Sequence, residues 1–239
     1  ARHNLEGARQ IKNPVDNTDG QIQSRWKNWA ERIFHETKTF ETCREVLHFA
    51  QSKIPFDHRT SVKADVSEYE LYACLINGEF PYQLYLLDVL EDNKNSIPET
   101  LYLYDGKIVS NVFFWHLRNM FFCQTHVAPL RSILEIGGGY GTLARLWLLN
   151  PEVKIDRYVI VDLPEALFFS EVTLRAEFGD RVGYWNGKDP GTQVVLVPVG
   201  RLEEYTKPSD LVINVGSFQE MSDIWISHYM KWLDIYQAK

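Results

Sequence analysis

The segment Ile133–Gly141 constrains the fold of this chain more than any other part of the sequence. It begins as a short apolar strand that contains one acid, Glu135, and it ends in a turn rich in glycine. A helix is predicted to begin directly after the turn, at Thr142. Glycine lets backbone N–H groups approach a bound molecule closely, and the start of a helix offers unpaired N–H donors. The segment therefore predicts a strand, turn and helix that form a cradle for a cofactor.

A second predicted strand, Tyr158–Asp162, also ends in an acid. In α/β nucleotide-binding folds, an acid at the end of the second strand holds the hydroxyl groups of a ribose. Asp162 has an alternative role, because Asp is a good N-cap and Pro164 suits the first position of a helix. In either role, Asp162 lies at the edge of the sheet that also carries the glycine turn.

The spacing of the glycines distinguishes between cofactors. A dinucleotide-binding turn has the pattern G-x-G-x-x-G, in which a helix N-terminus faces a pyrophosphate. Here the spacing is tighter, since Gly137, Gly139 and Gly141 are each two residues apart. Glu135, just upstream, would repel a pyrophosphate and would suit a cation, such as the sulfonium or the amino group of S-adenosylmethionine.

Three motifs in a fixed order extend this pattern: Leu134–Arg145, Asp162–Ala166 and Ser217–Met221. With them the chain resembles the class I S-adenosylmethionine-dependent methyltransferases, and within that class the bacterial sugar O-methyltransferases. The resemblance extends over residues 98–230. It implies a Rossmann-like sheet, S-adenosylmethionine as the methyl donor and S-adenosylhomocysteine as the product.

The order of the predicted elements indicates an α/β fold in two parts. Residues 130–239 alternate strands and helices, which is typical of a mainly parallel sheet covered on both faces. We interpret them as the S-adenosylmethionine-binding, Rossmann-like domain. Residues 1–129 are interpreted as a mainly helical lid or acceptor module with a β-hairpin at 101–109, where Asp105-Gly106 suits a two-residue turn. The predicted strands of the sheet are 132–136, 158–162, 193–197 and 210–215, and the predicted helices are 21–51, 69–77, 81–90, 111–127, 142–150, 164–178 and 222–236.

The predicted sheet is incomplete. Methyltransferases of this class usually have seven strands, and four are predicted before the sequence ends at Lys239. An open sheet that lacks nearly half of its strands would expose an apolar edge. We therefore expect the C-terminal strands to be missing from this sequence and the natural protein to continue beyond Lys239.

Residues at the carboxyl ends of the predicted strands are candidates for cofactor binding, because ligands of parallel sheets bind there. In this class, Glu135 would hold the amino group or the ribose side of the cofactor, Asp162 would bind the ribose hydroxyls, and Leu163 would lie against the adenine. Alternatively, Glu135 is a solvated acid, and the glycines allow tight packing of helix against strand. The candidates are Glu135, Gly137, Gly138, Gly139, Gly141, Asp162, Leu163, Val199, Gly200, Gly216 and Ser217.

Two further segments contribute to this set. Val199 and Gly200 follow the third predicted strand, where this class reads the edge of the adenine. The class often has an acid there and this chain does not, so backbone groups would have to make the contact. Gly216 and Ser217 follow the fourth strand and are expected to face the transferred methyl group.

Three residues are candidates for catalysis. Glu220 would accept a proton or bind a metal, or else it is an acid that complements the dipole of the following helix. His116 and His228 are candidate bases because histidine titrates near neutral pH, with a packed or surface position as the alternative for each. The spacing of His, Cys, Asp and Glu in the sequence predicts no metal site.

Composition argues against several classes of function. The net charge of −7 disfavours general nucleic-acid binding, which needs a basic surface. The sequence has no apolar run of about 18 residues, so no membrane span is predicted. Its polar start lacks a signal-peptide core, and Cys43, Cys74 and Cys123 are too far apart to suggest a disulfide framework or a zinc site. We therefore expect a cytoplasmic protein with free thiols.

The sequence thus predicts an enzyme, an S-adenosylmethionine-dependent O-methyltransferase that acts on a hydroxyl of a sugar or sugar-like acceptor. The carbohydrate acceptor is implied by the resemblance alone, and the chain is compatible with a homo-oligomer. The alternatives are a methyltransferase for another small molecule, a catalytically silent methyltransferase-like binding or scaffold protein, and a nicotinamide oxidoreductase, which the glycine spacing disfavours.

Overall fold

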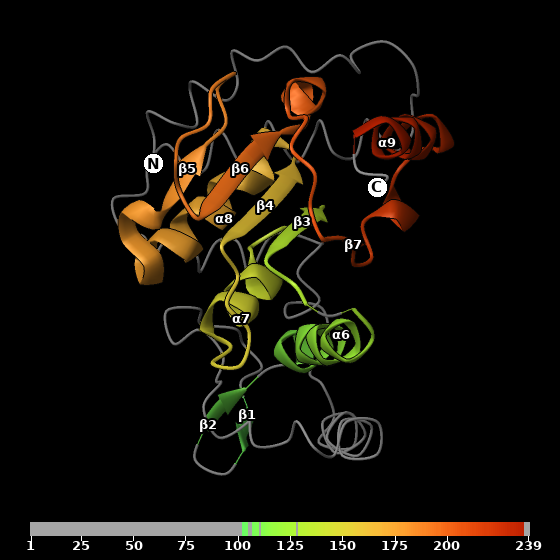
Figure 1. Cartoon of the computed structure of the whole chain (residues 1–239). Coiled ribbons are helices and arrows are strands. Elements are labelled where there is room, and N and C mark those ends of the chain that lie inside the picture. Colours follow the sequence, from blue (N-terminus) through green and yellow to red (C-terminus); the bar gives the residue numbers. More distant parts are fainter. Residues whose placement is uncertain (1–101, 105–106, 110, 128, 237–239) are drawn as a thin grey trace. The chain divides into compact units, whose positions relative to one another are not determined.

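The structure, a computed structural model, describes most of the C-terminal part of the chain (Figure 1). These residues belong to two compact units. We call residues 130–141 and 155–236 the sheet unit, and the other described residues the helical unit. The helices predicted over 21–51, 69–77 and 81–90 lie outside the described residues. The residues described are 102–104, 107–109, 111–127 and 129–236.

The sheet unit is built on a sheet that has five parallel strands within the described residues, in the order β5-β6-β4-β3-β7 (Figure 1). This confirms the predicted α/β fold with a parallel sheet, an arrangement compatible with a Rossmann-like fold. The four predicted strands are present, each within one residue of its predicted bounds. The strands are β3 (Ser132–Ile136), β4 (Arg157–Asp162), β5 (Val182–Tyr184), β6 (Val194–Pro198) and β7 (Leu211–Asn214).

The order of the strands reverses at β3. From β3 the chain continues to β4, then to the edge strand β5 and to β6 between β5 and β4, and it finally crosses to the other side of β3 as β7. Ile133 of β3 is thus aligned with Tyr158 of β4 on one side and with Leu211 of β7 on the other. Ligands of open parallel sheets bind beyond the carboxyl ends of the strands at such a reversal. The end of β3, where the glycine turn begins, is therefore the expected position for a ligand.

Strand β5 was not predicted from the sequence. It has three residues with Gly183 in the middle, and glycine weakens the pattern by which a strand is recognised. A Cβ on Gly183 would come within 2.9 Å of Pro190 Cβ and of Thr192 Oγ1. Glycine is therefore present here because the loop before β6 packs closely on β5.

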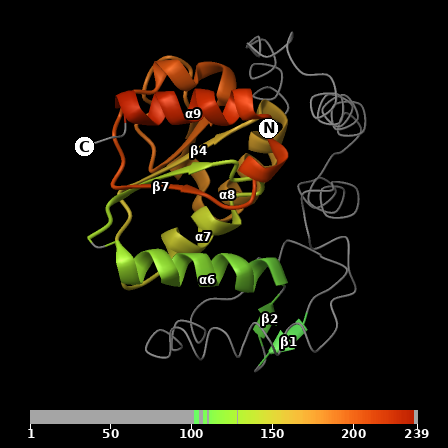
Figure 2. The same ribbon diagram turned by 90° about the vertical axis from the view of Figure 1, so that its right-hand side faces the viewer.

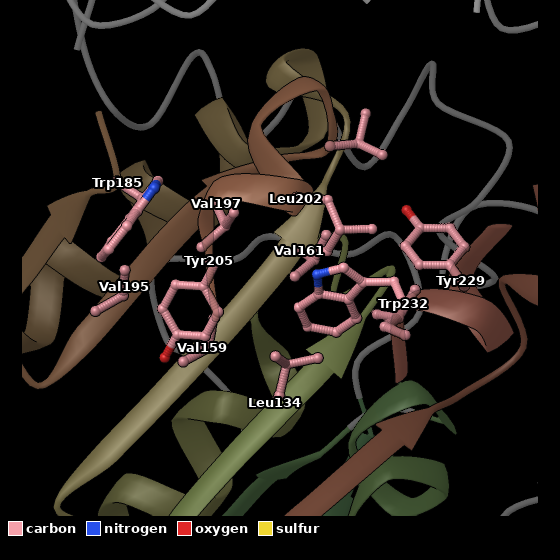
Figure 3. Close-up of a cluster of buried hydrophobic side chains, with 12 residues drawn as sticks. Leu134, Val159, Val161, Trp185, Val195, Val197, Leu202, Tyr205, Tyr229 and Trp232 are labelled. Carbon is pink, nitrogen blue, oxygen red and sulfur yellow. The ribbon is translucent and has the colours of Figure 1, made fainter. Parts of the chain in front are cut away.

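Helices cover both faces of the sheet. Figure 2 shows α9 (Asp223–Tyr236) on one face and α8 (Pro164–Phe178) on the other. On the α9 face, alternate residues of β3, β4 and β6 pack with residues of α9 and of the short helix η4 (Val199–Glu204), as Figure 3 shows. This core includes Leu134, Ile136, Val159, Val161, Val195, Val197, Leu202, Tyr229 and Trp232. Strands buried between two layers are apolar on both faces, which is why these segments have continuous apolar sequences.

Helix α8 has the bounds that the sequence predicts. Pro164 occupies its first turn, where a missing N–H has no cost, and Leu163 before it has extended backbone. Gly179 ends the helix with φ of 54°, a conformation that favours glycine, and its N–H bonds to the carbonyl of Arg175. These signals place the start of α8 directly after the carboxyl end of β4.

The helical unit contains the predicted hairpin and two described helices. β1 (Tyr102–Tyr104) and β2 (Lys107–Val109) pair antiparallel, which confirms the hairpin. Helix α6 (Asn111–His126) packs on α7 (Thr142–Leu149), the helix that follows the glycine turn in sequence. No helix among the described residues is long and apolar enough to cross a membrane. The buried side chains of α6 recur at three- and four-residue steps and include Phe113, Leu117, Met120 and Phe121.

A single carboxylate joins the beginnings of β3 and β7. Asp210 Oδ2 accepts hydrogen bonds from Arg131 N at 2.8 Å, from Ser132 N at 2.7 Å and from Ser132 Oγ at 2.9 Å. Asp210 N donates in turn to Ser132 O at 3.0 Å. The pKa of Asp210 is lowered from its usual value, mainly by the hydrogen bond from the backbone N–H of Arg131. These contacts fix the register at which β7 enters the sheet.

Asp210→Ala is expected to lower the free energy of unfolding at pH 7 by about 1–2 kcal/mol, because two backbone N–H groups lose an ionised acceptor. Urea denaturation measures the loss. A carboxylate with a lowered pKa stabilises the fold above its unfolded pKa, so the loss should disappear as the pH falls below about 4. Asp156→Ala is the control, since its exposed ion pair with Arg131 spans 3.4 Å and should contribute less than about 0.5 kcal/mol. Equal losses in the two variants would contradict this role for Asp210.

Candidate functional site

The turn Gly137–Gly141, which we call the glycine loop, adopts a conformation that favours glycine. Gly137, Gly139 and Gly141 have φ of 77°, 54° and 76°, all in the left-handed region. The loop is closed by a bond from Gly141 N to Gly138 O at 2.8 Å, and Gly137 N donates to Val161 O of β4 at 2.8 Å. The left-handed backbone of the loop therefore favours glycine at each of these three positions.

The surroundings of the four glycines differ. A Cβ on Gly137 would lie 2.0 Å from Ser217 Oγ, and one on Gly138 would lie 2.7 Å from Ile160 Cγ2. A Cβ on Gly141 would likewise lie 2.8 Å from Leu174 Cδ1. A Cβ on Gly139 would meet no heavy atom of the described residues within 4 Å. Close packing therefore accounts for three of the glycines, and Gly139 borders open space.

Asp162 connects the glycine loop to the end of β4. Its Oδ2 accepts a hydrogen bond from Gly139 N at 2.9 Å, and its Oδ1 accepts one from Leu163 N at 2.7 Å. The N-cap residue of α8 is Leu163, so Asp162 does not take the alternative role of helix cap. Burial raises the pKa of Asp162 to about 6 although the two N–H bonds lower it, and the negative charges of Glu165 and Glu220 raise it further.

Glu135 lies under the glycine loop and is buried, with 1% of its surface exposed. Tyr158 of β4 donates its hydroxyl to Glu135 Oε2 at 2.9 Å, and the same oxygen lies 3.1 Å from the position of a Cβ on Gly138. Burial raises the pKa of Glu135 to about 7, the Tyr158 bond lowers it, and the charge of Asp162 raises it. The alternative of a solvated acid at a strand end is therefore wrong for Glu135.

The end of β7 is tied to the end of β3 by side-chain hydrogen bonds. Asn214 Nδ2 donates to Ile136 O at 2.8 Å and to Ser217 Oγ at 2.5 Å, and Ser217 Oγ donates to Ile136 O at 3.1 Å. Asn214 Oδ1 accepts from Phe218 N at 3.2 Å. Gly216, with φ of 83°, makes the turn that returns Ser217 to the loop. Ser217 and the glycine loop thus meet where the strand order reverses.

The remaining cofactor candidates lie farther along the same unit. Leu163 is half-buried and packs against the core on the α9 face. Val199 and Gly200 begin η4, and the Val199 side chain is buried in that core. Any ligand contact at Val199 would therefore come from its backbone, as the absence of an acid in the sequence suggests.

The three catalytic candidates have different surroundings. Glu220 is half-buried in the short helix η5 (Phe218–Glu220) after β7, and its charge acts on Asp162. His228 is on α9, where its Nε2 lies 3.3 Å from Glu203 Oε1 of η4. His116 is half-buried on α6, in the helical unit. The sheet unit therefore places the charge of Glu220 where it acts on Asp162, and it pairs His228 with Glu203.

The sequence did not single out three residues that support the loop. They are Tyr158, which bonds to Glu135, Ser170, which donates to Gly139 O at 2.5 Å, and Asn214. The sequence could have indicated Asn214, because it is a polar residue at the end of an apolar strand. The sequence could not have indicated Ser170, because a serine within a helix has the same local pattern whether or not it contacts another element.

Comparisons with known proteins do not assign this site. No protein-family model matches the chain, and no curated protein matches it. Within the described residues, no group of three His, Cys, Asp or Glu side chains is placed to hold a metal ion.

Gly137→Ala and Gly139→Ala separate packing from backbone strain. Each variant places a Cβ on left-handed backbone, at a cost of about 1–2 kcal/mol, and Gly137→Ala adds a clash with Ser217. We expect urea denaturation to show a loss of about 3 kcal/mol or more for Gly137→Ala and about 1 kcal/mol for Gly139→Ala. Equal losses would show that the two positions are packed alike.

The pKa of Glu135 predicts that its charge destabilises the fold at alkaline pH. An acid whose pKa rises from 4.5 to about 7 on folding binds a proton as the chain folds. Its cost is absent below the lower value and complete above the higher one. In Glu135→Gln the charge is gone, and an oxygen that accepts the Tyr158 hydroxyl remains.

We expect the free energy of unfolding of Glu135→Gln to be higher than that of the wild type at both pH values. The difference should be on the order of 3 kcal/mol at about pH 8 and less than about 1 kcal/mol at about pH 5. Urea denaturation of both proteins at both pH values gives the comparison, in which the titration of groups that do not interact with Glu135 cancels. A difference that does not depend on pH would contradict the assignment.

Proposed function

We propose that this chain binds S-adenosylmethionine at the glycine loop and transfers its methyl group to a hydroxyl of a sugar or sugar-like acceptor. The observation that carries the proposal is the contact between the loop and an acid, in which Gly139 N donates to Asp162 Oδ2 at 2.9 Å. The contact lies at the carboxyl ends of β3 and β4, the edge at which parallel sheets bind ligands. The choice of a carbohydrate acceptor rests on the resemblance of the three sequence motifs.

The charges around the loop favour a cationic ligand over a pyrophosphate. Asp162 raises the pKa of Glu135, and Glu165 and Glu220 raise the pKa of Asp162. Four carboxyl groups therefore act on one small region. A ligand with a sulfonium and an ammonium group would relieve their repulsion, whereas a pyrophosphate would increase it.

The chemistry requires few catalytic side chains. The acceptor oxygen forms a bond to the methyl carbon as the bond from carbon to sulfur breaks, and the hydroxyl proton passes to a base. Holding the three atoms in line supplies roughly 7–11 kcal/mol of the barrier reduction. Glu220 is the proposed proton acceptor, because it is half-buried and its charge acts on Asp162, whereas His228 already contacts Glu203.

Isothermal titration calorimetry of the full chain with S-adenosylhomocysteine tests the cofactor. We expect one binding site for S-adenosylhomocysteine and none for NAD. Asp162→Ala should weaken binding by about 10- to 100-fold, because it removes a charged acceptor from the loop. Asp234→Ala, which removes an exposed acid from α9, is the matched control and should leave the affinity unchanged.

Other outcomes would overturn parts of the proposal. Binding of NAD in place of S-adenosylhomocysteine would identify a dinucleotide site. Binding of S-adenosylhomocysteine without transfer of a labelled methyl group to any hydroxyl in a panel of sugars and other small molecules would identify a binding protein. Transfer to a hydroxyl outside the carbohydrates would keep the reaction and replace the acceptor.

A further inference from the structure

We propose that Ser170 is a positioning residue that holds the glycine loop in the conformation that receives the ligand. Ser170 lies on α8 and is completely buried. Its Oγ donates a hydrogen bond to Gly139 O at 2.5 Å. The role in ligand binding rests on the proposed function, whereas the restraint on the loop does not.

Both polar groups of the Gly139 backbone form hydrogen bonds. Its N–H donates to Asp162 at the end of β4, and its carbonyl accepts from Ser170 on α8. The N–H and the carbonyl flank the two rotatable bonds of the residue, so the pair of hydrogen bonds restrains both φ and ψ. The left-handed φ of 54° is thereby fixed by contacts from two different elements.

Helix α8 contacts the loop at three places. The rings of Phe169 and Tyr140 are 5.6 Å apart, and a Cβ on Gly141 would lie 2.8 Å from Leu174 Cδ1. Ser170 lies between these apolar contacts and adds a directional bond. One face of α8 therefore supports three consecutive loop residues, 139–141.

Hydrogen bonds matter at Gly139 because packing does not restrain it. A Cβ at this position would have no heavy atom of the described residues within 4 Å, so none of their side chains packs against the residue from that direction. Glycine also loses more conformational freedom on ordering than any other residue. A loop that is already ordered avoids that loss when a ligand binds. The Ser170 hydroxyl should therefore strengthen ligand binding without contacting the ligand.

Ser170→Ala and a matched control test this role. Thr173→Val also removes a buried hydroxyl from α8, and Thr173 Oγ1 has no hydrogen-bond partner among the described residues. In protein labelled with ¹⁵N-glycine, NMR follows hydrogen exchange at the Gly139 amide. The Gly191 amide, which donates to Asp189 Oδ1 at 2.9 Å, serves as an internal reference.

We expect Ser170→Ala to accelerate exchange at Gly139 by about fivefold or more, with exchange at Gly191 unchanged within about twofold. Calorimetry should show S-adenosylhomocysteine binding weakened by about five- to tenfold. Thr173→Val should change neither quantity. If Ser170→Ala does not fold, Ser170→Cys, which is similar in size and only a weak donor, is measured in the same way.

Each result decides between a specific restraint and a general packing role. The proposal would be overturned if Ser170→Ala accelerated exchange equally at Gly139 and Gly191, or if Thr173→Val had the same effect as Ser170→Ala. It would also be overturned if Ser170→Ala left both the exchange rate at Gly139 and the affinity unchanged. If the wild type does not bind S-adenosylhomocysteine but Ser170→Ala selectively accelerates exchange at Gly139, the proposed function fails and the restraint on the loop stands.

Discussion

The hydrogen bond from the Gly139 N–H to the Asp162 carboxylate is the contact on which the edge of this sheet depends. It joins the loop after β3 to the end of β4, and the second oxygen of Asp162 accepts from Leu163, where α8 begins. Ser170 on α8 donates a hydrogen bond to the carbonyl of Gly139. Loop, strand and helix therefore form a closed circuit of hydrogen bonds. Opening it at one point would leave a buried polar group without its partner, so the three elements hold their positions together.

The charged forms of Glu135 and Asp162 destabilise the fold. Burial raises the pKa of Asp162 to about 6 and that of Glu135 to about 7, which means that each charge is disfavoured in its surroundings. The neighbouring positions on the other face of the same strand, Leu134 and Ile136, are ordinary core residues. A neutral side chain at position 135 would satisfy the Tyr158 hydroxyl at lower cost. Pairs of acids with raised pKa values gather at functional sites, so the electrostatics support a binding role independently of the glycine motif.

The sequence predicted those parts of the structure that depend on local pattern. The four main strands and α8 follow from apolar periodicity, glycine and proline, whereas β5 was missed because Gly183 interrupts a segment of three residues. The two roles of Asp162 could not be separated, because its distance from the loop depends on the register between β3 and β4. Ser170 was not foreseen for the same reason: its partner lies 31 residues away in the chain, and the packing of α8 alone brings them together.

The glycine loop contains two kinds of glycine that the sequence pattern cannot distinguish. Gly137, Gly138 and Gly141 are explained by neighbours that lie 2.0, 2.7 and 2.8 Å from the position of an added Cβ. Gly139 has no such neighbour in the described structure, and its N–H and carbonyl are bonded to β4 and α8. Asparagine tolerates the same φ and would suffice if the turn served only to reverse the chain. A bare backbone beside open space would let another molecule approach closely, so the proposed ligand would account for the one glycine that packing does not explain.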